Sequence, residues 1–68
     1  MKYTVVIERA KGNFSAYLPD VPGCVATGKT RAQALRKIRT ALAMHLEGLR
    51  EDGLRIPPPS ARAELIDA

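Results

Sequence analysis

Between positions 18 and 30 the chain reads LPDVPGCVATGKT, a segment interrupted by prolines and glycines that organises the expected fold. Pro19 has no backbone N–H to donate, so the strand that precedes it should end there. Pro22-Gly23 fills the central positions of a type II turn over residues 21–24, because proline presets the first position and glycine tolerates the positive φ of the second. A short strand is expected at residues 24–28. The segment therefore predicts two strands joined by a tight connection.

Upstream of this segment, apolar and polar residues alternate with the period of β-strands. In a strand over residues 2–9, one side carries Tyr3, Val5 and Ile7, and the other carries Thr4, Val6 and Glu8. In the next strand, Phe14, Ala16 and Leu18 alternate with Ser15 and Tyr17. Lys11-Gly12-Asn13 between the two runs is a turn signal. The two strands should therefore pair as an antiparallel hairpin.

Downstream, residues 31–52 have the pattern of an amphipathic helix. Thr30 and Gln33 form a capping box, in which each side chain accepts a hydrogen bond from a backbone amide at the start of the helix. The apolar stripe recurs at spacings of three and four and consists of Leu35, Ile38, Leu42, Leu46 and Leu49. Gly53 is the expected C-terminal cap, and the prolines at 57–59 cannot continue a helix. A last short strand is expected at residues 62–67.

These elements predict an α+β fold in the order β-β-β-α-β, with an antiparallel three-stranded sheet plus a short last strand, and one long helix packed on one face. The chain has 68 residues, 46% of them hydrophobic, which is enough for one core. We expect a single domain over residues 1–68 and no separate DNA-binding domain. A lone cysteine, Cys24, and the lack of a signal peptide or membrane-spanning run in the sequence place the protein in the cytoplasm as a prediction.

Residues typical of catalytic and metal sites are scarce. One His, one Cys and two Ser occur in no arrangement of nucleophile, base and orienting group. Glu8 and Asp20 are the only acidic residues before Glu47, too few for a two-metal nuclease. His45 lies at the edge of the apolar stripe, as packed boundary residues do. We therefore predict no enzymatic activity, no catalytic or metal-binding residues and no cofactor.

A basic region is the main electrostatic feature of the sequence. The chain has 11 Lys or Arg against 7 Asp or Glu, a formal net charge of +4, and no acidic residue between Val21 and Leu46. Two interpretations stay open: a solvated surface, or an alternative function as a nucleic-acid-binding module that neutralises phosphates with side chains in and just before the helix. The side chains concerned are Lys29, Arg36, Lys37 and Arg39. Few aromatic residues are left for stacking on bases, so we expect nucleic-acid binding to be weak or absent.

The segment from Leu18 to Cys24, preceded by a Gly-x-Phe strand and followed by Gly28-Lys29-Thr30 and a long helix, resembles the HicB-like antitoxins of type II toxin-antitoxin systems. The resemblance covers nearly the whole chain and corresponds to the N-terminal, partial RNase H-like domain of that family. It implies a protein that binds and neutralises a small mRNA-cleaving toxin of the HicA type and that self-associates. Many relatives carry a further DNA-binding segment, which we do not expect here, and they tend to have Glu in the first helical turn, where Arg31 and Gln33 stand in this sequence.

The surface predicted to bind a partner follows from the fold. One helix can cover only one face of the sheet, so the opposite face, with Val6 and Tyr17, is expected to contact a second copy or a different protein. Asp20, Val21 and Pro22 add the adjoining loop, where Asp20 either bonds to loop amides or presents a carboxylate to a basic partner. We predict a homo-oligomer, with a dimer as its simplest closed form.

Overall fold

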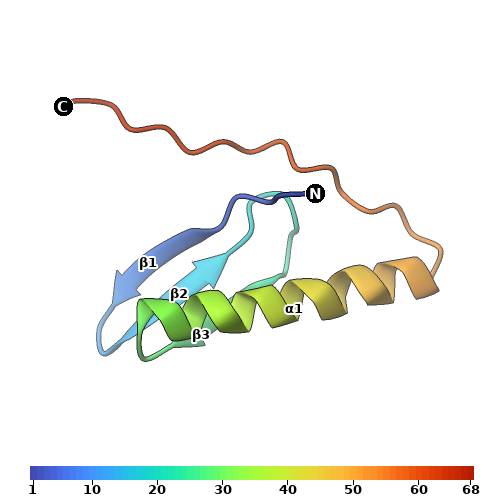
Figure 1. Ribbon diagram of the computed structural model, residues 1–68, viewed down its shortest axis with the longest axis horizontal. Coiled ribbons are helices and arrows are strands. Elements are labelled where there is room, and N and C mark those ends of the chain that lie inside the picture. The colour runs from blue at the N-terminus through green and yellow to red at the C-terminus, as the bar shows by residue number, and fades with distance from the viewer.

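Three antiparallel strands form one open sheet in the order β1-β2-β3, and a single long helix packs on one of its faces (Figure 1). The computed structural model describes all residues 1–68. Its elements are β1 (Val6–Ala10), β2 (Asn13–Tyr17), β3 (Val25–Gly28) and α1 (Arg31–Glu51). The predicted α+β class, with a hairpin, a third strand and a long helix, is therefore confirmed.

The strand register divides the sheet into two faces. Ile7 pairs with Ala16, and Ala16 pairs with Ala26, so these three side chains form one row. This row packs against the core beneath α1. The neighbouring row, one residue along each strand, consists of Val6, Tyr17 and Val25. Because successive side chains of a strand point to opposite faces, this second row lies on the face away from the helix.

The core lies between the sheet and the first half of α1. Six hydrophobic residues are buried there: Ala16, Leu18, Val21, Cys24, Ala34 and Ile38. The helix packs mainly against β3, less against β2 and least against β1. Gly28 explains this placement, because a Cβ on it would stand only 2.6 Å from the backbone nitrogen of Ala34. The end of β3 thus touches the helix backbone directly, as only glycine allows.

Local signals set both ends of α1. The Thr30 hydroxyl accepts a hydrogen bond from the Gln33 amide at 3.0 Å, as the capping box predicts, whereas the Gln33 side chain accepts from the Lys29 amide at 2.6 Å, one residue before the expected donor. At the other end, Gly53 adopts a φ of +68° and donates to the Arg50 carbonyl, and Leu54 donates to the Leu49 carbonyl. This pair of bonds is a Schellman motif, which satisfies carbonyls that a helix end leaves free.

The predicted last strand at residues 62–67 is wrong. Beyond Leu54 no backbone group takes part in a backbone hydrogen bond, and the segment runs in an extended form along the β1 side of the sheet (Figure 1). Side chains hold it instead: the Tyr3 hydroxyl donates to the Pro57 carbonyl, and the Thr4 hydroxyl donates to the Ala61 carbonyl at 2.7 Å. Prolines 57–59 have no N–H to donate, so a strand ladder cannot begin where the segment first reaches the sheet.

The first strand is also shorter than expected, since β1 begins at Val6 and not at Lys2. Its partner β2 ends at Tyr17, two residues before Pro19, and the chain then turns away. Residues 2–5 therefore have no neighbouring strand to pair with. Their side chains are free to contact the helix and the C-terminal segment.

Candidate protein-binding surface

The outer face of the sheet carries an apolar row that crosses all three strands. This outer row consists of Val6, Tyr17 and Val25, which are directly paired. Tyr17 is 40% exposed and Val25 is 66% exposed, while Val6 is half-buried. The helix occupies the opposite face, so no element of this chain covers the row. Aligned side chains on adjacent strands form a continuous surface, which suits contact with another protein.

Polar side chains border the outer row on the same face. Glu8, Ser15 and Thr27 form the next cross-strand row. An apolar strip with a polar margin is the usual composition of a protein–protein interface, whose centre is apolar and whose rim is polar.

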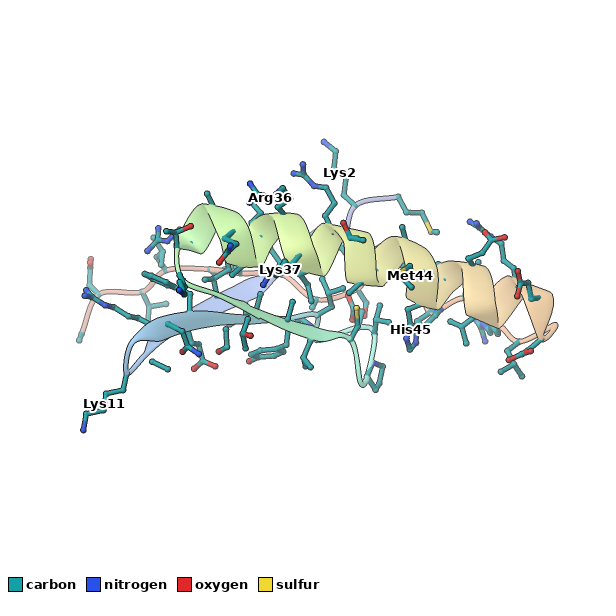
Figure 2. The ribbon with its side chains drawn as sticks, turned by 90° about the horizontal axis from the view of Figure 1, so that it is seen from below. Lys2, Lys11, Arg36, Lys37, Met44 and His45 are labelled. Carbon is teal, nitrogen blue, oxygen red and sulfur yellow. The ribbon has the colours of Figure 1, made fainter.

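Val25 was not among the residues predicted to bind a partner, although the sequence contains a signal for it. A strand that starts after the Pro22-Gly23 turn and places Ala26 over the core must direct Val25 outward, because side chains alternate. Beyond Val25 the apolar surface continues around the edge of β3 to Met44, which is 71% exposed. Figure 2 shows Met44 and His45 on the part of the helix beyond the strands. Both line a shallow hollow with Val25, Gly23, Cys24 and Ala41.

Of the three loop residues predicted to bind a partner, Pro22 presents an exposed side chain. Val21 is 1% exposed and belongs to the core, so it cannot contact a partner in this structure. The turn over residues 21–24 is of the predicted kind. Gly23 has a φ of +83°, and the Cys24 amide donates to the Val21 carbonyl at 3.2 Å. Proline in the first central position and a positive φ in the second define a type II turn.

The Asp20 carboxylate holds the C-terminal segment. It accepts hydrogen bonds from the Ser60 amide at 2.8 Å, the Ser60 hydroxyl at 2.9 Å and the Ala61 amide at 2.9 Å. The Ala61 amide is the main cause that lowers the pKa of Asp20; partial burial opposes it, and the amide and hydroxyl of Ser60 add to the lowering. Asp20 thus has a structural role, which was one of its two predicted roles. Its donors, however, lie 40 residues away in the sequence and not in its own loop.

The basic side chains do not form one stripe. Lys29 and Lys37 line a polar hollow with Gln33, on the β3 flank of the helix. Arg39 borders an apolar groove on the other flank, and Arg36 is exposed (Figure 2). None of these four makes an ion pair, since the single ion pair of the structure joins Glu47 to Arg50. Several cations are therefore free, but they point in different directions.

The structure contains no group of three or more His, Cys, Asp or Glu side chains that could hold a metal ion. Cys24 is buried, and its burial raises the pKa of the thiol, which disfavours the reactive thiolate. The buried thiol packs as a small apolar group, as expected. No helix is long and apolar enough to cross a membrane.

Comparisons with known proteins agree with this picture. A family model described as the HicB_like antitoxin of bacterial toxin-antitoxin systems matches residues 3–68. A solved structure, "HicA3 and HicB3 toxin-antitoxin complex", contains a chain that matches with a TM-score of 0.73 and 33% identity over 87% of this chain and 70% of that one.

Curated relatives match over most of this chain. An uncharacterized 14.9 kDa protein of Haemophilus phage HP1 is 35% identical over 98% of this chain and 50% of its own length. UPF0150 protein Ta0767 of Thermoplasma acidophilum is 35% identical over the full length of both proteins. Antitoxin HicB 2 of Photorhabdus laumondii is 33% identical over 94% of this chain and 46% of its own. The chain thus spans about half the length of two relatives and all of the third. By its family match and by the identity of these relatives, the chain belongs to the HicB-like antitoxin family.

Proposed function

We propose that this protein neutralises a small toxin of the HicA type by binding it, and that the outer row is the centre of the contact. The observation that carries the proposal is the match, at 33% identity and a TM-score of 0.73, to a chain from a toxin-antitoxin complex. The exposed residues Tyr17 and Val25, together with the nearby Met44, give the chain the large apolar side chains that such a contact needs.

The composition of the outer row fits a protein partner. Tyrosine is enriched among the residues that dominate binding energy, because it buries a large rigid area and keeps a polar tip. Tyr17 stands in the middle of the row, between Val6 and Val25, with polar neighbours that can form a rim. Inhibition then follows from covering the toxin, and the antitoxin itself carries out no reaction.

Two substitutions on β3 test the contact. Val25 and Thr27 are both exposed, and alternation places them on the same outer face. We expect Val25→Asp to weaken binding by about tenfold or more, because a charge would be buried at the centre of the contact. Thr27→Asp, the matched control, should change the affinity by less than about threefold, as rim substitutions do.

The measurement is direct. The chain is co-expressed with a tagged toxin of the HicA type, and co-elution and the dissociation constant are measured, together with relief of growth arrest. Equal effects of the two substitutions would contradict the outer row as the site. Failure of the unaltered protein to bind or neutralise the toxin would contradict the proposed function itself.

The same proposal predicts that the pure protein does not cleave RNA. Glu8 and Asp20 are the only carboxylates in the first 46 residues, and Asp20 is already bound to Ser60 and Ala61. Metal-dependent cleavage of RNA that is lost on changing Glu8 or Asp20 would contradict it.

A further inference from the structure

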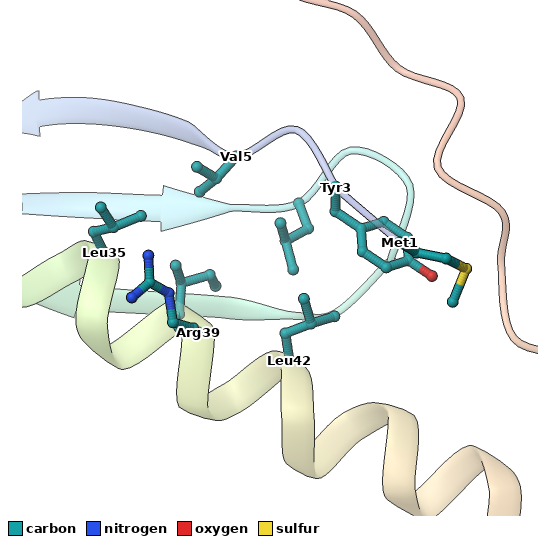
Figure 3. A pocket seen from close by; sticks show the side chains of 8 residues that line it. Met1, Tyr3, Val5, Leu35, Arg39 and Leu42 are labelled. Carbon is teal, nitrogen blue, oxygen red and sulfur yellow. The ribbon is translucent and has the colours of Figure 1, made fainter.

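An apolar groove lies between α1 and the first residues of the chain (Figure 3). It has a volume of about 230 Å³ and is lined by Met1, Tyr3, Val5, Leu18, Leu35, Ile38, Arg39 and Leu42. The groove exists because α1 packs over β3 and contacts β1 least. The core face beside β1 is therefore left without a full cover.

β1 follows directly on the groove residues Tyr3 and Val5, and its outer edge is free. β1 pairs with β2 alone and is the first strand of the sheet order, so one side of β1 has backbone groups without partners. A strand added there would extend the sheet, and alternate side chains of that strand would point to the helix side. Those side chains would lie over the groove.

The chain also contains an unpaired extended segment with the required pattern. Residues 62–68 make no backbone hydrogen bonds, and Leu65 and Ile66 are 102% and 90% exposed. Alternation puts Ala63, Leu65 and Asp67 on one side, and Glu64 and Ile66 on the other. The first side is apolar with an acidic end, whereas the groove is apolar with Arg39 at its border. The two surfaces are complementary in both hydrophobicity and charge.

We propose that residues 63–67 of one copy add as a strand to the β1 edge of a second copy, which donates its own segment in return. Leu65 then fills the groove of the other copy, and Asp67 pairs with Arg39, which has no ion pair in the single chain. Ile66 lies on the opposite face, beside Val6 of the outer row.

The strand is assigned to a second copy because the chain leaves its own segment unpaired. Within one chain the segment is already held at Ser60 and Ala61 by Asp20 and Thr4. From this anchor it continues past β1 without pairing (Figure 1). An exchange of identical segments closes with two-fold symmetry and forms each contact twice. This contact adjoins the outer row at Val6 but leaves Tyr17 and Val25, which the toxin test probes, uncovered.

The test is sedimentation of the purified chain at micromolar concentrations. The unaltered protein should be a dimer, and Leu65→Asp should raise the dimer dissociation constant by at least about a hundredfold, because two charges would enter two apolar grooves. Arg39→Asp should raise it by about tenfold, and adding Asp67→Arg to that variant should restore the dimer by reversing the charge pair. Glu64→Arg is the matched control on the opposite side and should have little effect.

Three results would overturn the proposal. In the first, the unaltered protein is a monomer. In the second, amides 63–67 are protected from hydrogen exchange equally at all concentrations, which would place the strand on its own β1. In the third, Asp67→Arg fails to rescue Arg39→Asp although each variant melts as the unaltered protein does. Toxin binding by the Val25→Asp variant is measured separately. A negative result for the dimer therefore does not decide the proposed toxin binding.

Discussion

The two margins of the sheet are built in different ways. At β3 the backbone itself meets the helix, with Gly28 in contact with Ala34 and no room for a further atom. At β1 the helix makes its fewest contacts, and an extended segment is held nearby by hydrogen bonds that the Tyr3 and Thr4 hydroxyls donate and the Asp20 carboxylate accepts. The β3 margin depends on close packing and the β1 margin on polar anchoring. The β3 margin fixes the outer row relative to the helix, whereas the β1 margin keeps a free strand edge to which another chain can add.

The largest expected effect is at the β3 margin. Gly28→Ala would place a methyl group 2.6 Å from the Ala34 nitrogen, which is part of the helix backbone and cannot turn aside. We expect a loss of about 3 kcal/mol in the free energy of unfolding, at the upper end for overpacking. Gly48→Ala is the control, since nothing lies within 4 Å of its Cβ position. That change in mid-helix should stabilise the protein by up to about 1 kcal/mol. Thermal melts that rank the two variants in the opposite order would contradict the close contact.

A smaller loss is expected at the turn that leads into β3. Gly23 has a φ of +83° and open space around its Cβ position, so any penalty comes from the backbone alone. Gly23→Val should lower the free energy of unfolding by about 1–3 kcal/mol, because a β-branched residue is strained at positive φ. Gly23→Asn should lower it by less, since asparagine tolerates that conformation. Urea denaturation of both variants measures the difference, and an unchanged midpoint for Gly23→Val would argue against the turn.

At the β1 margin we expect a local effect of pH. Because the pKa of Asp20 is lowered in the folded state, its bonds to Ser60 and Ala61 stabilise the anchor fully at neutral pH. This stabilisation is lost as the pH falls below the ordinary carboxyl range and through the lowered pKa. Amide exchange at residues 60 and 61, followed by NMR, should rise in acid.

Asp20→Asn should release the same amides already at neutral pH, because a neutral amide side chain offers one acceptor oxygen in place of the carboxylate's two. The melting of the β3 margin should change little. Exchange at residues 60 and 61 that is indifferent to both pH and this substitution would show that Asp20 does not anchor the segment.

The smallest expected effect concerns the basic side chains on the helix, between the two margins. Lys37 and Arg39 point to opposite flanks, so they cannot follow one phosphate backbone together. We expect a dissociation constant for nucleic acid above about 1 μM at physiological salt, and the affinity should fall further as the salt concentration rises. Lys37→Gln and Arg39→Gln should each weaken it slightly and equally. Tight, sequence-selective binding in a titration at that salt concentration would favour the nucleic-acid alternative.

Much of the fold could be predicted, but less of the binding surface. Val6 and Tyr17 were placed on the outer face from alternation alone, and the structure pairs them directly. Val25 was missed although alternation along β3 indicates it, whereas Val21 was misplaced because the loop folds inward to fill the core. A loop residue's exposure depends on what packs against it, which no local pattern contains.

Sequence alone determined the features whose causes lie within a few residues. Three such features are the Pro22-Gly23 turn, the Thr30 cap and the Gly53 end of the helix. Each depends on the conformational preferences of its own residues and not on contacts with distant parts of the chain. Tertiary structure decided the rest. It brought Ser60 and Ala61 to Asp20 across some 40 residues and pressed the helix against Gly28. It also kept residues 62–67 out of the sheet, although their alternation suits a strand, because strand formation requires a neighbouring edge at hydrogen-bonding distance and not only a suitable sequence.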